Sequence, residues 1–197
     1  MDLTHYFYTE DYTSAIPDGF YADNGNVERR KGISLKDFHD EYDCKKPVIL
    51  TGLAEMWPAR SKWTTDQLLL NYGDVAFKIS QRTSRKIKMK LKGYVFYMKL
   101  QHDEDPLYIF DEKFGEAAPS LLKDYYVLHM FQEDYFDVLD TDKRPFYRWL
   151  LIGPESSGAS WHVDPALTSA WNTLLSGRKR WALYPPGKVP LGVNSSC

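Results

Sequence analysis

The sequence predicts a mainly β domain that is preceded by a region of mixed α and β structure. From Arg148 onward, short runs of strand-forming residues alternate with clusters of Gly, Pro and Ser, which is typical of a sandwich or barrel. Before that point, a capped helix twice leads into a strand. The 197 residues, of which 43% are hydrophobic, suffice for one domain with its own core.

The composition excludes several classes of protein. A formal net charge of -2 provides no general attraction to nucleic acids or membrane surfaces. Cys44 and Cys197 cannot form a disulfide framework and do not have the spacing of a zinc motif, which favours a reducing, intracellular compartment. Met1–Ser14 lacks the basic and apolar regions of a signal peptide, and there is no run of about 18 apolar residues to cross a membrane. We therefore expect neither secretion nor membrane insertion.

The mixed region begins with an irregular arm, a helix and a strand. Residues 1–31 are polar and aromatic with interrupting Pro and Gly, so we expect an arm without regular structure. Ser34 followed by Asp37 resembles a capping box and predicts a short helix over 35–42. The apolar run 47–50 then indicates a buried strand.

A second helix and a second strand follow. Thr64, with Gln67 three residues later, predicts a helix over 65–71 that ends at Gly73. The strand-forming run 75–80 comes directly afterwards. The order of helix and then strand is therefore repeated.

The segment 86–92 alternates lysine and apolar residues strictly. As a strand, it would display its lysines on one face and its apolar side chains on the other. One interpretation is a basic strip for an acidic partner. A second is a sheet edge whose lysines prevent pairing with other strands, and a third is a nuclear-import signal.

The stretch from Asp103 to Tyr147 is rich in aromatic and acidic residues without low-complexity bias. This composition indicates a packed subdomain of short helices and turns. Strand-like runs separated by Gly, Pro and Ser clusters follow at 149–152, 160–163, 170–175 and 178–184. The second half of the chain is therefore expected to hold most of the β structure.

His162 and Asp164 form a candidate metal site. On a strand, side chains two residues apart point to the same face, so the imidazole and the carboxylate could occupy two positions around one ion. Non-haem iron(II) oxygenases use two histidines and one carboxylate on one face of the ion and leave the other positions open. The alternative is a surface hydrogen bond between the two side chains, because a three-residue pattern also arises by chance.

A hairpin predicted over 170–184 contributes a second candidate. If residues 176–177 form a two-residue loop, Asn172, Lys179 and Trp181 lie on one face of the hairpin. A lysine that points into an apolar interior needs an anionic partner, and a bound dicarboxylate would satisfy it. A loop that is one residue longer would turn Lys179 toward water instead.

Three segments resemble the core of the Jumonji C (JmjC) oxygenases, which depend on iron(II) and 2-oxoglutarate. They are Tyr147–Pro154, Gly158–Pro165 and Thr168–Pro186. The resemblance also includes Pro106–Asp111 and is most specific to the subfamily of arginine demethylases and lysyl hydroxylases, once called phosphatidylserine receptors. It implies an incomplete double-stranded β-helix, a cupin-like jelly roll, as part of a JmjC domain at 32–193. The irregular arm at 1–31 precedes this domain, and a divergent tail at 194–197 follows it.

The resemblance implies roles for individual residues. His162 and Asp164 would be metal ligands, and Lys179 would pair with the distal carboxylate of 2-oxoglutarate. The residues that would assist in or shape that pocket are Asn172, Tyr108 and Trp181. Ala159 stands where the family often has a threonine that contacts the cosubstrate.

One ligand of the family's set has no counterpart. In the family, a second histidine ligand follows the Tyr-Pro-Pro segment at some distance, whereas this sequence ends at Cys197. The other histidines all precede His162, and we expect them to be structural or surface residues. We therefore expect a C-terminally truncated form that lacks the closing strands of the β-helix.

The resemblance implies a protein hydroxylase or demethylase that uses Fe(II), O2 and 2-oxoglutarate to oxidise lysine, methyl-lysine or methyl-arginine side chains. The expected partner is a protein substrate such as a histone tail, in the nucleus or otherwise in the cytoplasm, with no direct binding to nucleic acid or membrane. Activity is expected to be impaired in a truncated form. The alternatives are a catalytically inactive JmjC module that binds protein, and a cupin barrel without redox chemistry.

Overall fold

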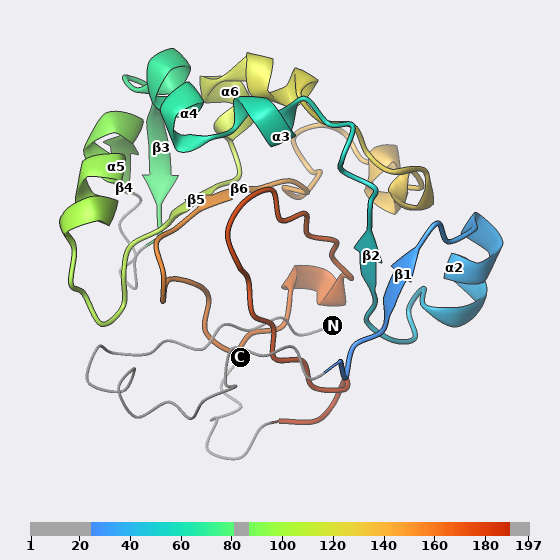
Figure 1. The fold of residues 1–197 in the computed structure, drawn as a ribbon. Coiled ribbons are helices and arrows are strands. Elements are labelled where there is room, and N and C mark those ends of the chain that lie inside the picture. Colours follow the sequence, from blue (N-terminus) through green and yellow to red (C-terminus); the bar gives the residue numbers. More distant parts are fainter. Residues whose placement is uncertain (1–24, 81–86, 190–197) are drawn as a thin grey trace.

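The computed structural model describes residues 25–80 and 87–189 of the chain (Figure 1). Most of the predicted arm, the first lysine of the predicted strip and the divergent tail lie outside the described residues. Within the described ranges, no helix combines the length and the apolar composition that are needed to cross a membrane.

The N-terminal part of the described chain joins a helix to a pair of parallel strands. Strand β1 (Arg29–Lys31) pairs with β2 (Ile49–Thr51), and helix α2 (Leu35–Glu41) lies between them in the sequence. The first capping prediction is confirmed, because the Ser34 hydroxyl accepts a hydrogen bond from the Asp37 backbone N–H at 3.1 Å. The sequence predicts no strand at β1, whose basic residues become a strand only through pairing with β2.

The second sheet has four antiparallel strands in the order β4, β3, β5, β6. They are β3 (Ala76–Ile79), β4 (Ile87–Lys90), β5 (Ile109–Asp111) and β6 (Leu150–Ile152). The predicted strands at 75–80 and 149–152 are confirmed as β3 and β6. Among the described residues, the ladder between β3 and β5 consists of one residue pair, Ile79 with Ile109. Few backbone hydrogen bonds of the ladder type therefore join these two central strands.

Among the described strands, β4 is an outer strand of this sheet, so the predicted edge position is confirmed for 87–90, while the role of its lysines in preventing pairing stays a prediction. The strand ends at Lys90, and a helix begins with the next residue. The Asp74 carboxylate lies 2.7 Å from Lys92 Nζ and 3.0 Å from Lys90 Nζ, and these ammonium groups lower the pKa of Asp74 to about 2. Part of the positive charge of the strip is therefore matched within the chain.

Helices cover one face of the sheet (Figure 1). They are α3 (Ala59–Lys62), α4 (Thr65–Tyr72), α5 (Leu91–Leu100) and α6 (Phe114–Ala117). Helix α4 confirms the second capping prediction, since the Thr64 hydroxyl accepts a hydrogen bond from the Gln67 backbone N–H at 3.3 Å. The core of this part includes the buried residues Leu68, Phe77, Ile79, Leu91, Tyr94, Ile109 and Leu121.

Short helical turns form much of the aromatic stretch, as predicted, but the stretch also contains strand β5, which was not predicted from the sequence. The turns include the 3-10 helices η1 (Pro119–Lys123), η2 (His129–Phe131) and η3 (Tyr135–Val138). Around η2 and α2, a second core contains the buried residues Phe38, Tyr42, Trp57, Leu128 and Met130. Tyr125 of the aromatic stretch packs against both cores and so helps to join the two sheets.

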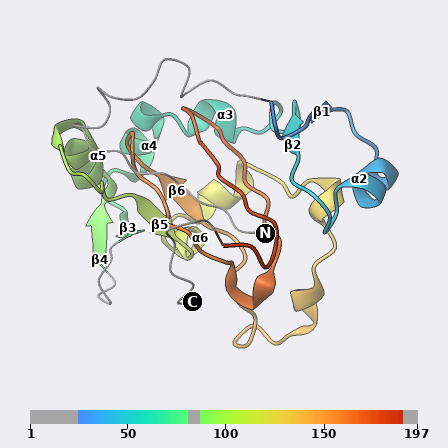
Figure 2. The same cartoon turned by 90° about the horizontal axis from the view of Figure 1, so that it is seen from below.

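The two faces of β5 have different surroundings. Ile109 and Asp111 point toward the helices and are almost fully buried, whereas Tyr108 and Phe110 alternate to the other side. The ring of Phe110 stacks on that of Trp149, with centroids 6.2 Å apart. Figure 1 and Figure 2 show that the chain after β6 runs over this second side of the sheet.

The strand predictions for 160–163 and for the hairpin at 170–184 are wrong. Among the described residues of these segments, only Ala182 forms a β-bridge. The bend at the tip of the predicted hairpin explains part of the difference. Gly177 has a φ of 81°, whereas the residue before it does not have a positive φ. A two-residue hairpin loop needs a positive φ at its first position, and other turns splay the two arms apart.

Candidate metal and cosubstrate site

His162 and Asp164 lie next to one another, although in a loop and not in a strand. Nε2 of His162 is 3.5 Å from Oδ1 of Asp164. Nδ1 of His162 is 2.7 Å from the carbonyl oxygen of Ser160, which can only accept, so Nδ1 carries the proton and donates it. In the neutral ring, Nε2 therefore presents its lone pair on the side of the Asp164 carboxylate.

The distance between the two side chains is close to that between two neighbouring metal ligands. Two ligand atoms that are about 2.1 Å from an ion and at right angles are about 3.0 Å apart, and the observed separation is 3.5 Å. Two acceptors that face each other repel, and a cation between them removes that repulsion. Within the described ranges, no group of three His, Cys, Asp or Glu side chains forms a metal site. The distance within the pair would allow His162 and Asp164 to occupy two positions around one ion.

A turn and an aromatic contact hold the chain around the pair. Asp164 precedes the 3-10 helix η4 (Pro165–Leu167), and its carbonyl oxygen accepts from the Leu167 N–H at 3.1 Å. On the other side of the pair, the ring of Trp161 packs edge-on against that of Tyr184, with centroids 5.4 Å apart. The loop that carries the pair therefore lies beside the Tyr-Pro-Pro segment.

Lys179 and Trp181 contact each other, although the strand that was predicted to place them on one face does not form. Nζ of Lys179 lies 4.1 Å from the centre of the Trp181 ring, which is a cation–π contact. Burial of the ammonium group lowers the pKa of Lys179 to about 8. Desolvation alone causes this shift, so no carboxylate among the described residues compensates the charge. The side chain is thus a half-buried cation that an anionic ligand would stabilise.

Tyr108 and Asn172 are placed differently. Tyr108 lies directly before β5, on the side of the sheet that the chain after β6 covers, and burial raises the pKa of its phenol. Its backbone N–H donates to the Ser80 hydroxyl at 3.2 Å. Asn172 is exposed to solvent. Convergence of these two residues with Lys179 and the ligand pair on one cavity stays a prediction.

Gly153 and Ser157 approach each other closely, which the sequence analysis missed. A Cβ atom at Gly153 would lie 2.1 Å from Ser157 Oγ and 3.1 Å from Tyr108 Cβ. The Ser157 hydroxyl donates to the Pro154 carbonyl oxygen at 2.7 Å and closes the turn that leads from β6 toward the ligand pair. The signal in the sequence is the Gly-Pro pair that follows an apolar strand.

The substitution Gly153→Ala is expected to lower the free energy of unfolding by about 1–3 kcal/mol, because the added methyl group overlaps the Ser157 hydroxyl. Urea denaturation followed by circular dichroism measures this loss. The double variant Gly153→Ala/Ser157→Ala no longer has the overlapping oxygen, so most of the stability should return. A double variant that is no more stable than Gly153→Ala would show that the close approach is not the cause.

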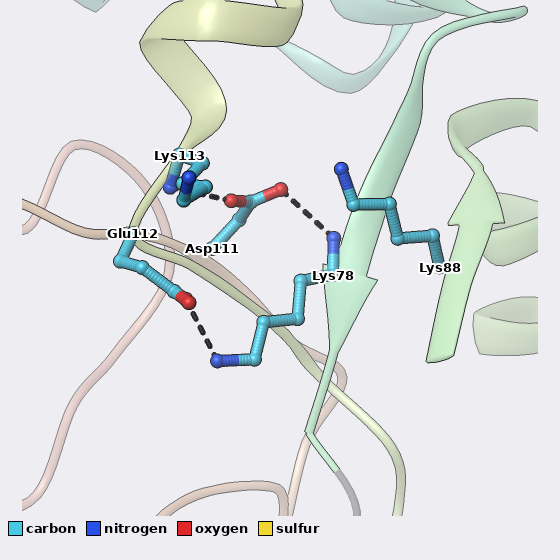
Figure 3. A pocket seen from close by; sticks show the side chains of 5 residues that line it. All are labelled: Lys78, Lys88, Asp111, Glu112 and Lys113. Atoms are coloured by element: carbon cyan, nitrogen blue, oxygen red, sulfur yellow. Dashed lines mark hydrogen bonds and ion pairs between the residues drawn. The ribbon is translucent and has the colours of Figure 1, made fainter. Parts of the chain in front are cut away.

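A cavity at the β3, β4 and β5 strands uses acids and lysines structurally. It has a volume of about 260 Å³ and is lined by Lys78, Lys88, Asp111, Glu112 and Lys113 (Figure 3). Nζ of Lys78 lies 2.7 Å from the Glu112 carboxylate. The Asp111 carboxylate accepts from the backbone N–H groups of Lys78 at 2.8 Å and Lys113 at 2.7 Å. Both acids are engaged within the chain, and none of the predicted site residues lines this cavity.

Comparison with known proteins bears on the family and the fold of the chain. A family model described as a cupin-like domain matches residues 36–191. This match, together with the open antiparallel sheet, confirms the predicted fold class, an incomplete jelly roll with an N-terminal mixed α/β region.

Relatives of known name are similar over most of the chain. Lysine-specific demethylase JMJ21 of Arabidopsis thaliana is 72% identical over 89% of this chain and 19% of its own length. Arginine-specific demethylase JMJ22 of the same organism is 45% identical over 87% of this chain and 33% of its own length. The bifunctional arginine demethylase and lysyl-hydroxylase psr-1 of Caenorhabditis elegans is 41% identical over 82% of this chain and 42% of its own length.

The chain thus spans less than half the length of each of these relatives. The resemblance to JmjC proteins that the sequence predicts is confirmed, and the chain belongs to the cupin-like domain family.

Proposed function

We propose that this chain contributes two iron ligands and a cosubstrate-binding lysine to a JmjC-type protein hydroxylase or demethylase. In this proposal the enzyme uses Fe(II), O2 and 2-oxoglutarate to oxidise lysine, methyl-lysine or methyl-arginine side chains of histones or other proteins. The observation that carries the proposal is the ligand pair, in which Nε2 of His162 and Oδ1 of Asp164 are 3.5 Å apart. The relatives named above support the class of reaction.

Each residue of the proposed site has one task. His162 and Asp164 hold the metal, and the Ser160 carbonyl keeps the proton on Nδ1 so that Nε2 is free to bind. Bound iron(II) supplies the activation of dioxygen that the oxidation needs. Lys179 donates to the distal carboxylate of 2-oxoglutarate, and its half-buried position strengthens this charge-assisted hydrogen bond. Trp181 shields the ammonium group from water on one side.

Two neutral donors complete the proposed cosubstrate pocket. The Tyr108 phenol and the Asn172 amide are assigned to the oxygen atoms of 2-oxoglutarate. The buried phenol retains its proton at neutral pH, because burial raises the pKa of Tyr108, and it can therefore donate. Asn172 is exposed in the free chain, so bound cosubstrate would have to bring it into contact.

The names of the relatives favour a protein side chain as the substrate. They describe demethylation at lysine or arginine and hydroxylation of lysine. A histone tail in the nucleus fits both the chemistry and the expected location, and neither nucleic acid nor membrane is proposed to bind directly. The substrate residue is in each case basic or a methylated form of a basic residue.

Two protein ligands hold a metal ion less tightly than three, so His162 and Asp164 by themselves are expected to bind the metal weakly. The competing proposal is a catalytically inactive JmjC module that binds protein. It is supported by the exposed apolar side chains of Tyr135 and Val138, which a bound protein would cover. The two proposals differ in whether His162 matters for turnover.

Succinate release from 2-oxoglutarate in the presence of Fe(II) separates the two proposals. The chain is expected to release succinate at least about tenfold faster than His162→Ala, because a missing ligand weakens metal binding by at least this factor. His39→Ala is the matched control, since His39 lies in α2 and contacts Asp43 at 3.0 Å. Electron paramagnetic resonance of bound Mn(II) shows whether His162→Ala loses metal binding as well as turnover. Equal background release by the chain and by His162→Ala would favour the inactive module.

A further inference from the structure

The segment 133–147 carries more negative charge than the whole chain. It contains the acids Glu133, Asp134, Asp137, Asp140 and Asp142 and the bases Lys143 and Arg144, so its formal net charge is -3 against -2 for all 197 residues. The rest of the chain is therefore slightly positive. In Figure 2 this segment, drawn in tan, lies at the rim of the molecule on the side away from β4.

The same segment exposes large apolar side chains. Val138 is 86% exposed and Tyr135 is 78% exposed, and the helix η3 that carries both has no buried residue. Phe146 and Tyr147 are about half exposed at the other end of the segment. Single exposed apolar residues are ordinary, but several within a short segment indicate a contact surface. We refer to residues 133–147 as the acidic rim.

Arg144 holds the acidic rim in a fixed shape. Its guanidinium group forms ion pairs with Asp134 and with Asp137, the latter at 3.0 Å, and lies 4.1 Å from the centre of the Tyr147 ring. Asp134 also accepts from the backbone N–H of Phe136 at 3.0 Å and so caps η3. The exposed side chains are therefore presented on an ordered turn, which lowers the entropic cost of binding.

The two bases of the acidic rim are already engaged by its own acids. Lys143 pairs with Asp140 at 3.1 Å, and Arg144 bridges two further acids. Glu133 and Asp142 are exposed and form no ion pair with another described residue. Asp137 and Asp140 remain largely open to solvent, with 76% of each side chain accessible. The surface consequently offers surplus carboxylates beside uncovered apolar groups.

We propose that the acidic rim docks a lysine- and arginine-rich segment of the protein substrate. The identity of the partner rests on the proposed function, because the substrate residues of the relatives are basic. Charge complementarity selects this occupant, since ammonium and guanidinium groups meet the surplus carboxylates. The aliphatic stems of the same side chains cover Val138 and Tyr135, and an arginine can also stack on the exposed tyrosine ring.

The lysine-rich strand β4 is a poorer docking surface for a charged partner. Lys90 at the end of the strand and Lys92 in the first turn of α5 both contact Asp74, so part of the positive charge of this region is neutralised within the chain. A basic partner would in addition be repelled by the remaining lysines. The acidic rim is therefore the described surface that best fits a basic segment.

Binding of a labelled basic peptide tests the proposal without iron and without 2-oxoglutarate. The probe is a fluorescein-labelled peptide of lysine, arginine and glycine, and fluorescence anisotropy measures its Kd. We expect Asp140→Asn/Asp142→Asn to raise the Kd about three- to tenfold, because each exposed ion pair contributes modestly. Val138→Ser should raise it about two- to fivefold through lost contact with the aliphatic stems.

Matched controls distinguish local from general charge. Glu55→Gln/Glu104→Gln removes the same number of charges from exposed positions outside the acidic rim and should leave the Kd unchanged. A peptide with glutamate in place of its basic residues should not bind. Equal Kd values for the chain, for Asp140→Asn/Asp142→Asn and for the control variant would overturn the proposal.

Two further outcomes are informative. If sedimentation shows a dimer that Val138→Ser dissociates, the acidic rim is a contact between copies of this chain and the docking proposal is wrong. Because peptide binding is measured without metal, a failure of the proposed oxygenase function leaves the docking result intact. Loss of docking with succinate release preserved would conversely affect only this inference.

Discussion

The substitution Asp111→Ala is expected to lower the free energy of unfolding by about 2–4 kcal/mol. The Asp111 carboxylate is 1% exposed and accepts hydrogen bonds from the backbone N–H groups of Lys78 and Lys113. Its removal leaves two donors without partners in a partly buried place, and each such donor costs about 1–3 kcal/mol. The effect should be large because β3 and β5 share little ladder of their own. Urea denaturation followed by circular dichroism gives the value.

Two variants serve as comparisons for Asp111→Ala. Asp111→Asn keeps one oxygen acceptor and should lose less stability than the alanine variant. Asp140→Ala removes an exposed acid and should stay within about 0.5 kcal/mol of the unchanged chain. If Asp111→Ala and Asp140→Ala were equally stable, the carboxylate at 111 would not be what joins β5 to β3.

The substitution Lys179→Met is expected to raise the Kd for 2-oxoglutarate about 10- to 150-fold. A charge-assisted hydrogen bond of this type contributes about 1.5–3 kcal/mol, and methionine keeps the length of the side chain without its charge. Isothermal titration calorimetry with Mn(II) in place of iron(II) measures the binding. Lys188→Met is the matched control, since Lys188 is an exposed lysine of the same segment. Similar Kd values for both variants would contradict the assignment of Lys179.

The same interaction predicts how binding depends on pH. In the free chain, burial lowers the pKa of Lys179 to about 8, so the ammonium is largely present below that pH and is lost above it. A bound carboxylate favours the ammonium form and raises the pKa again, so binding above pH 8 takes up a proton. The affinity should therefore be constant below pH 8 and fall by up to about tenfold per unit above it. Lys179→Met should not show this dependence.

Local signals in the sequence were sufficient for two helices but not for a third. Helices α2 and α4 begin where a hydroxyl binds a backbone N–H three residues later, a contact that the sequence itself contains. Helix α5 could not be predicted in this way. Gly93 and Val95 have a low helix propensity, and the alternation of lysine and apolar residues, which favours a strand, continues past the first residue of the helix. The helix forms because Leu91 and Tyr94 are buried in the core.

Strands are less predictable because each needs a neighbour. The strand-forming runs at β3 and β6 pair with neighbouring strands of the sheet. The described apolar runs after residue 160 have the composition of strands but do not form a ladder with another strand. The site shows the same division. The spacing of His162 and Asp164 predicts that they are close, but the Ser160 carbonyl that fixes the histidine proton is a property of the loop. Asp111 was missed although it alternates with the buried Ile109 on one strand face.

The edge-on contact between Trp161 and Tyr184 joins the loop of His162 and Asp164 to the Tyr-Pro-Pro segment without a β-ladder. A ladder would fix the spacing of the two ligand atoms through directional bonds, whereas ring edges slide over one another at little cost. In the proposed metal site, the distance between the two ligand atoms would therefore be free to adapt to ions of different radius. If the proposal holds, selectivity among divalent ions would come from the chemistry of the donor atoms and not from a rigid cage.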